Sequence, residues 1–91
     1  MSKKRERLEV IYDILKVVRD SGNSIKPTRL LYASNLSPQM FKEYIDELLG
    51  KGFLASTEDD DNRRTYSLTT KGFTFLEKYK TVMEMIENFG L

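Results

Sequence analysis

The sequence has no cysteine, no histidine and no tryptophan, and it has only two prolines and five glycines in 91 residues. Without cysteine or histidine it lacks the usual zinc ligands, a thiol nucleophile, the serine–histidine triad and imidazole acid–base chemistry. Most familiar enzyme mechanisms therefore lack a side chain that they require. We expect a binding protein rather than an enzyme, with no metal, no cofactor and no small-molecule substrate.

Long apolar runs are also absent. No stretch approaches the roughly twenty residues needed to cross a bilayer, and the start at Met1–Arg7 lacks the apolar segment of a secretion signal. We therefore expect a cytoplasmic protein with no membrane partner. A chain of this length supports one domain with a small core.

The chain has little excess charge, because 15 lysines and arginines face 14 acidic residues for a net charge of +1. A general nucleic-acid coat protein normally carries a large basic excess, so DNA binding here would depend on local clusters. The basic clusters are Lys3, Lys4, Arg5 and Arg7; Lys26 and Arg29; and Arg63 and Arg64, while Glu58–Asp61 forms an acidic run.

Apolar periodicity predicts two helices in the first 35 residues. The first runs from about Lys4 to Asp20 and is stopped by the Ser-Gly-Asn that follows it. The second is short, starts at Pro27 and ends near Ser34, with Leu30, Leu31 and Ala33 facing inward. Between them, Ser24–Lys26 is expected to be extended because Lys26 precedes proline.

A third helix is predicted to start at Pro38, with Ser37 as its cap, and to leave through Gly50–Gly52. A short helix, a tight turn and a second helix form a helix-turn-helix. After it, the β-prone runs Phe53–Glu58 and Tyr66–Leu68 flank a polar segment, which is typical of a hairpin.

The fourth helix is predicted from about Thr70 to Asn88, capped by Thr69 or Thr70. This order of elements predicts an α+β, mostly α fold, the winged helix-turn-helix with a long C-terminal helix. Residues 1–69 would form the DNA-binding head and residues 70–91 a dimerisation helix, in a single domain overall.

The fourth helix carries a heptad-type seam with spacings of four, three, four and three. Its members are Phe75, Tyr79, Val82, Ile86 and Phe89. The seam can pack on its own domain or on a second chain. Because three other helices already compete for a small core, we expect a homodimer joined by this helix.

Candidate DNA contacts lie on the third helix at Ser37, Gln39 and Lys42. The N-terminal part of such a helix enters the major groove, where glutamine reads adenine and lysine reaches guanine or phosphate. The plainer interpretation is an ordinary solvated face, since Glu43 and Asp46 would repel phosphate.

Phosphate contacts are expected at the start of the second helix, from Lys26, Thr28 and Arg29. The alternative is that Arg29 pairs with a carboxylate. Arg63 and Arg64 are further candidates, from the returning strand of the hairpin.

Two charged segments are less informative. The acidic hairpin tip at Asp59–Asn62 is more simply a solvated turn than a cation site. Lys3, Lys4, Arg5 and Arg7 form either an arm along the duplex or a solubilising helix start, and the two interpretations stand about even.

The sequence resembles the archaeal winged-helix DNA-binding proteins typified by the ten-kilodalton Sulfolobus "10a" class. The most specific part is Thr-Arg-x-x-Tyr-x-x-Asn-Leu-Ser at residues 28–37, followed by Leu-Thr-x-Lys-Gly at residues 68–72. The resemblance extends over nearly the whole chain. It implies a homodimer with antiparallel C-terminal helices and two DNA-binding heads, an archaeal or archaeal-virus origin, and a role in chromatin organisation or transcriptional control.

The sequence departs from that pattern at Pro27 and in the acidic wing. The first functional hypothesis is a dimeric protein that binds double-stranded DNA, as a transcriptional regulator or a nucleoid-associated factor. The alternative is a winged-helix adaptor that binds other proteins and not DNA, which the nearly neutral net charge allows. An enzyme based on the carboxylates of Asp59–Asp61 has little support.

Overall fold

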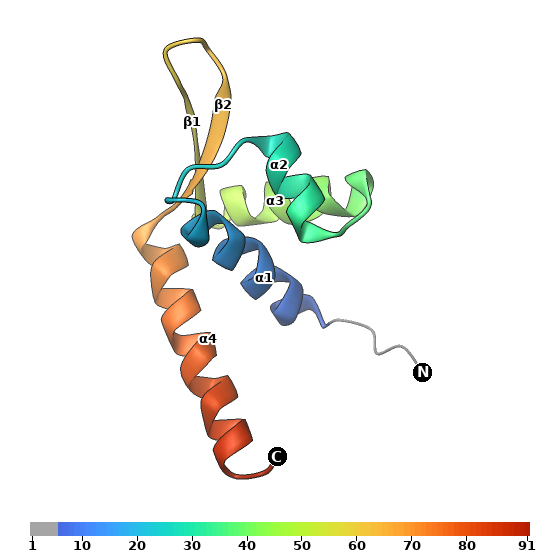
Figure 1. Ribbon diagram of the computed structural model, residues 1–91, viewed down its shortest axis with the longest axis vertical. Coiled ribbons are helices and arrows are strands. Elements are labelled where there is room, and N and C mark those ends of the chain that lie inside the picture. The colour runs from blue at the N-terminus through green and yellow to red at the C-terminus, as the bar shows by residue number, and fades with distance from the viewer. Residues whose placement is uncertain (1–5) are drawn as a thin grey trace.

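The computed structural model describes residues 6–91, which form four helices and one hairpin (Figure 1). The elements in chain order are α1 (Arg7–Asp20), α2 (Pro27–Ser34), α3 (Pro38–Gly50), β1 (Leu54–Glu58), β2 (Arg64–Leu68) and α4 (Thr70–Asn88). This confirms the predicted winged helix-turn-helix order and the mostly helical α+β class.

The first helix is shorter than its apolar pattern predicts. It begins at Arg7 rather than near Lys4, because Glu6 has an extended backbone (ψ 157°) and serves as the N-cap. It ends at Asp20, where Gly22 and Asn23 both adopt positive φ and reverse the chain. The side-chain oxygen of Asn23 then accepts a 2.6 Å hydrogen bond from the backbone N–H of Leu68, which ties this turn to β2.

The turn between α2 and α3 follows the predicted chemistry. Asn35 takes the left-handed conformation that ends α2 (φ 57°), and the Ser37 hydroxyl accepts a 3.2 Å hydrogen bond from the N–H of Met40. The prediction that Ala33 faces inward is wrong, since Ala33 is exposed and Ser34 is buried. The Ser34 hydroxyl donates to the carbonyl of Leu31 at 2.8 Å, so its burial leaves no unpaired polar group.

The hairpin is antiparallel, with a register that runs from Leu54 opposite Leu68 to Glu58 opposite Arg64. Ile25 adds a bridge to Tyr66 through two backbone hydrogen bonds of 3.1 and 2.8 Å, which confirms the extended segment before Pro27. The base of the hairpin is thus fixed to the head, whereas its tip projects away from the helices (Figure 1).

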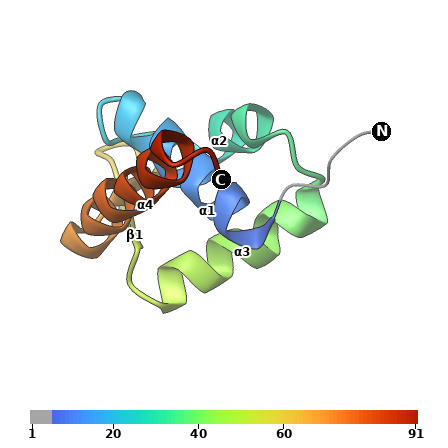
Figure 2. The ribbon, with the colours of Figure 1, turned by 90° about the horizontal axis from the view of Figure 1, so that it is seen from below.

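The core forms around α1, which lies in the middle with α2, α3 and α4 around it (Figure 2). Its largest fully buried side chains come from three helices and are Ile14, Leu15, Leu30, Leu48 and Val18. The buried residues Leu54, Tyr66 and Leu68 close the core from the hairpin, and Leu76 closes it from α4.

The beginning of α4 is set by a cap and a close approach. The Thr69 hydroxyl accepts from the N–H of Gly72 at 3.1 Å, which selects Thr69 as the cap. A side chain at Gly72 would bring a Cβ to 2.5 Å from the carbonyl oxygen of Phe53. Glycine is therefore required for α4 to lie this close to the start of β1.

Past its first turns, α4 leaves the head and runs away from it, toward the end opposite the hairpin tip (Figure 1). The molecule measures 49 × 31 × 21 Å as a result. Every residue from Lys80 to Leu91 is exposed.

Candidate nucleic-acid interface

All eight predicted DNA-contact residues are exposed. They lie on α2, on α3, in the hairpin and at the positions just before α2 and α3. None of them is used in the core, so the sequence places these polar and basic side chains where a partner can reach them. They fall into three groups by element.

The first group is at the start of α2, where Lys26 and Arg29 border a hollow of about 640 Å³ between that helix and the hairpin. Thr57 and Thr65 line the same hollow from the strands, and their hydroxyls are hydrogen-bonded to each other at 3.0 Å. Among residues 6–91, no carboxylate pairs with Arg29, which speaks against the alternative that Arg29 is held in an internal ion pair.

The second group is at the start of α3. Ser37 uses its hydroxyl as the cap, whereas Gln39, the second residue of α3, is exposed. Lys42 forms an exposed ion pair with Asp46, 2.7 Å from Nζ to Oδ2, and this hydrogen bond raises the pKa of Lys42. Such a surface pair is weak, so a phosphate can compete for the lysine.

The third group is the hairpin tip, whose acidic residues are mainly structural. The Asp59 carboxylate accepts hydrogen bonds from the backbone N–H groups of Arg63 (2.8 Å) and Asp61 (3.0 Å). The first of these bonds is the main reason why the pKa of Asp59 lies below its ordinary value, and the charges of Arg63 and Lys26 add to the effect. The tip is thus a self-contained turn with Asn62 in the left-handed conformation (φ 61°), and Arg63 and Arg64 follow it.

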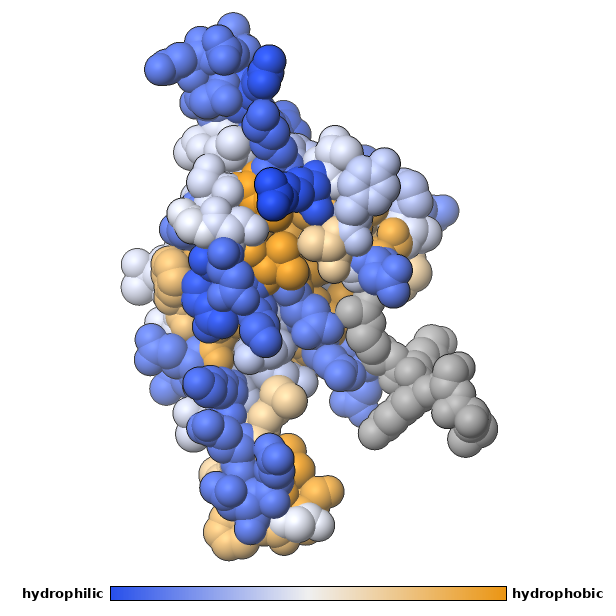
Figure 3. Space-filling view, viewed as in Figure 1, coloured by the Kyte–Doolittle hydropathy of each residue, from blue (hydrophilic) through white to orange (hydrophobic). Residues whose placement is uncertain are grey.

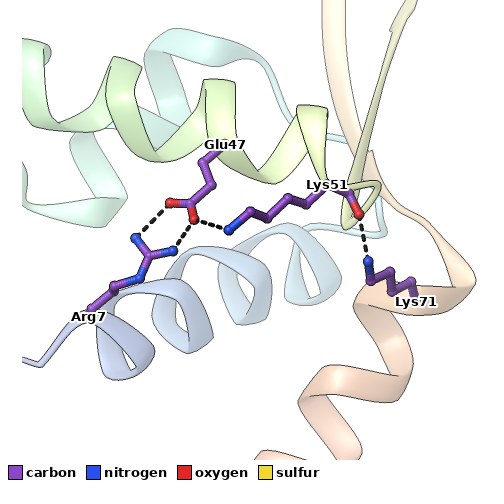
Figure 4. A network of polar contacts seen from close by, with 4 residues as sticks. All are labelled: Arg7, Glu47, Lys51 and Lys71. Atoms are coloured by element: carbon purple, nitrogen blue, oxygen red, sulfur yellow. Dashed lines mark hydrogen bonds and ion pairs between the residues drawn. The ribbon is translucent and has the colours of Figure 1, made fainter.

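Arg7, the one described residue of the basic N-terminal cluster, is engaged within the head. Arg7 binds the Glu47 carboxylate with both Nη atoms, and Lys51 reaches the same carboxylate at 2.7 Å (Figure 4). Hydrogen bonds from Arg7 and Lys51 lower the pKa of Glu47 to about 2. Arg7 therefore joins α1 to α3, while Lys3, Lys4 and Arg5 lie outside the described residues.

The same junction extends to α4. Lys71 donates a 2.8 Å hydrogen bond to the backbone carbonyl of Lys51 (Figure 4), and its Nζ lies 4.6 Å from the centre of the Phe53 ring. The first turn of α4 is thus attached by polar and cation–π contacts to the segment between α3 and β1.

The predicted dimer seam is divided between two environments. Phe75 and Tyr79 belong to a chain of aromatic contacts within the head: Phe53 to Phe75 at 5.7 Å, Phe75 to Tyr79 at 5.6 Å and Tyr79 to Tyr12 at 4.9 Å between ring centres. These two residues therefore have partners in their own chain.

The other three seam residues lack such cover. Val82 is 50% exposed, Ile86 45% and Phe89 75%. The neighbouring Met83, Met85 and Leu91 are also exposed, and Figure 3 shows apolar surface gathered at this end of the molecule, in contrast to the hydrophilic hairpin tip. Exposed apolar clusters on proteins are often interaction surfaces, so this cluster is a candidate for one.

Two features were not predicted from the sequence. One is the exposure of Tyr32 on α2, next to the predicted phosphate contacts, since Tyr32 belongs to the motif at residues 28–37 but was not among those contacts. The other is the pairing of Tyr79 with Tyr12, although Tyr12 belongs to the apolar stripe of the first helix. Within residues 6–91, no cluster of three or more acidic side chains forms a candidate metal site, and no helix combines the length and the apolar character that a membrane span requires.

Comparison with known proteins gives consistent matches. A family profile described as winged helix-turn-helix matches residues 4–87. An uncharacterized protein of Methanocaldococcus jannaschii, MJ0290, is 36% identical over 85 residues. This match covers 93% of the present chain and 37% of that protein, so the chain spans well under half of the relative's length.

Two solved structures are similar over almost the whole chain. Sso10a-2, a DNA-binding protein from Sulfolobus solfataricus, is 26% identical with a TM-score of 0.74, and the match covers 93% of this chain and 85% of that one. F93 from STIV, a winged-helix DNA-binding protein, is 26% identical with a TM-score of 0.77 and a coverage of 91% and 95%.

These matches confirm the resemblance to the archaeal 10a class that residues 28–37 and 68–72 carry. They also agree with the expectation of a binding protein rather than an enzyme. The profile spans every helix and strand from α1 into the last turn of α4, and the chain belongs to the winged helix-turn-helix family.

Proposed function

We propose that this protein binds double-stranded DNA as a homodimer and acts as a transcriptional regulator or a nucleoid-associated factor in the cytoplasm. The observation that carries the DNA proposal is the arrangement at α2 and α3. A short helix-turn-helix presents exposed polar and basic side chains at the beginning of both helices. Sso10a-2 and F93, which share this fold, are named as DNA-binding proteins.

In this proposal α3 enters the major groove with its N-terminal turns, and Gln39 contacts a base edge. Lys26, Thr28 and Arg29 bind phosphate at the start of α2, which positions α3 in the groove. Lys42 leaves its weak pair with Asp46 to bind the DNA. Arg63 and Arg64 bind the backbone from the hairpin, while the Asp59 turn shapes the tip without touching phosphate.

The homodimer is proposed from the exposed half of α4. Val82, Ile86 and Phe89 continue the heptad spacing beyond the residues that pack on the head. A second copy of α4 on a two-fold axis would cover them, and each fully covered large side chain contributes about 1.5–3 kcal/mol. Residues 1–69 then act as the head and residues 70–91 as the dimerisation helix, although Phe75 and Tyr79 of this helix pack against the head of their own chain.

A titration of the protein with duplex DNA at low and raised salt tests the DNA proposal. We expect binding that weakens as salt rises, because bound phosphates release counterions. Arg29→Ala should weaken binding to all sequences alike and lower the slope of log affinity against log salt by about one. Lys16→Ala, which removes an exposed charge from α1, is the matched control and should leave the slope unchanged.

Gln39→Ala addresses sequence preference rather than overall affinity. Contacts to base edges carry specificity, so the variant should change the ranking of different duplexes. An equal loss on every duplex would remove Gln39 from the base-reading surface.

The second candidate function is a protein-binding adaptor, which the net charge of +1 and the acidic hairpin tip favour. The same titration separates the two functions. If the wild-type protein does not bind duplex DNA even at low salt, the DNA proposal is wrong and the adaptor remains.

A further inference from the structure

Tyr32 differs from the other tyrosines of this chain. Its side chain is 79% exposed, whereas Tyr66 is buried at 5% and the remaining three are half-buried. Tyr12 and Tyr79 contact each other, so their rings have partners in the head. Among the large apolar side chains of residues 6–91, only that of Leu91 is more exposed than Tyr32.

The position of Tyr32 on α2 places it beside the proposed phosphate contacts. Thr28 is four residues earlier and Arg29 three, so all three side chains share one face of the helix. The opposite face is formed by Leu30 and Ser34, which are buried. Tyr32 therefore extends the exposed face of α2 by one turn, about 5.4 Å along the helix axis.

Tyr32 also lies at the turn that leads into α3. With Leu31, Asn35, Leu36 and Pro38 it lines a shallow hollow of about 200 Å³. Pro38 is the first residue of α3 and Ser37 is its cap. The ring thus lies between the two parts of the candidate interface, the start of α2 and the start of α3.

We propose that Tyr32 binds DNA, with its hydroxyl donating a hydrogen bond to a phosphate of the strand that α2 crosses. This inference rests on the proposed DNA-binding function and adds an uncharged contact to it. Tyrosine hydroxyls are among the groups that bind DNA phosphates. A tyrosine suits this place because its exposed ring borders the apolar hollow and carries a hydroxyl that can reach a polar partner.

An uncharged phosphate contact has a distinct signature. Removing it weakens binding equally on different sequences, because phosphates carry no sequence information. The salt dependence stays the same, because no charge is lost and no fewer counterions are released. Arg29→Ala would share the first property but not the second.

The experiment compares wild type with Tyr32→Phe on two duplexes of equal length, one rich in A·T and one rich in G·C, over a series of salt concentrations. Tyr12→Phe is the matched control, since it removes a hydroxyl from a ring that packs against Tyr79. Thermal unfolding of each variant reports on the fold. Because Tyr32 is exposed, its variant should unfold at the wild-type temperature.

We expect Tyr32→Phe to bind both duplexes about tenfold more weakly, as is typical for a lost hydrogen bond to a charged group, with the salt slope unchanged. Tyr12→Phe should bind as the wild type does. Wild-type affinity of Tyr32→Phe for both duplexes would overturn this inference alone. A loss confined to the A·T-rich duplex would also overturn it, because it would indicate contact with a base. Failure of the wild type itself to bind would overturn the proposed function together with this inference.

Discussion

The two halves of α4 carry the same heptad spacing but have different surroundings. In the first half, Gly72 and Leu76 are buried and Phe75 and Tyr79 are half-buried against the head. From Lys80 onward every residue is exposed, including large apolar ones such as Phe89. The spacing thus indicates which face of the helix is apolar, but it does not indicate what covers that face.

The difference assigns two tasks to one helix. The first half completes the core and is attached at its start by Thr69, Lys71 and Gly72. The second half contributes nothing to the core of a single chain. The following changes test whether these tasks are separable, and they are ordered from the largest expected effect on the stability of the head to the smallest.

The largest effect is expected from Leu76→Ala, because Leu76 is only 2% exposed and closes the core from α4. Truncating a buried leucine leaves a cavity, and the free energy of unfolding should fall by about 2–5 kcal/mol. Urea denaturation followed by circular dichroism measures this change.

Ile86→Ala is the matched comparison in the exposed half of α4. In the monomer its side chain is 45% exposed, so the head should keep its stability at low protein concentration. An effect should emerge only at concentrations where the chain is dimeric, since association adds to the apparent stability by mass action. Equal losses for Leu76→Ala and Ile86→Ala at every concentration would show that the two halves do not differ.

Gly72→Ala, at the start of the packed half, should lower the free energy of unfolding less than Leu76→Ala does. Its Cβ would lie 2.5 Å from the carbonyl oxygen of Phe53, which is backbone and cannot turn aside. Overpacking of this kind costs about 1–3 kcal/mol. At Gly50, in contrast, a Cβ meets nothing within 4 Å, and Gly50→Ala should cause no loss. Chemical denaturation of both variants measures how much the free energy of unfolding falls in each, and equal values would contradict a steric requirement at Gly72.

The smallest effect is expected from Glu47→Gln, which breaks the junction between Arg7, Lys51 and the end of α3. The pKa of Glu47 is lowered from 4.5 to about 2 in the folded protein. The ionised group therefore stabilises the fold above about pH 4.5, and this contribution is lost as the pH falls from there toward 2.

Urea denaturation should accordingly show a less stable Glu47→Gln at neutral pH and a shrinking difference from wild type as the pH falls through that range. Glu43→Gln, on the same helix but outside the junction, provides the control. A difference that stays constant at acid pH would mean that the charge of Glu47 does not stabilise the fold.

The helices and strands were predicted well from the sequence because the signals that begin and end them involve only neighbouring residues. Ser37 and Thr69 cap α3 and α4, Pro27 and Pro38 begin α2 and α3, and glycine or asparagine with positive φ follows each of the four helices. Each of these signals depends on a few neighbouring residues. The start of α1 was placed too early because basic residues favour a helix without specifying where it begins.

Long-range pairings were not predictable in the same way. Arg7 forms its ion pair with Glu47, which is forty residues away in the sequence, and Tyr79 of α4 contacts Tyr12 of α1. Nothing in the spacing of either segment identifies the partner. The candidate interface was predicted from residue type and position alone, which favoured basic residues, glutamine, serine and threonine and left Tyr32 out of the predicted contacts.

In the proposed dimer, the exposed half of α4 joins two copies of the chain and the packed half does not. Sedimentation equilibrium at micromolar concentration tests it most directly, with wild type, Ile86→Glu and Lys80→Glu compared side by side. Lys80→Glu changes the net charge of the chain more than Ile86→Glu does, but Lys80 is not one of the apolar seam residues of α4. We expect wild type and Lys80→Glu to be dimers and Ile86→Glu to be a folded monomer, because a buried unpaired charge is strongly unfavourable. A wild-type chain that sediments as a monomer would contradict the account.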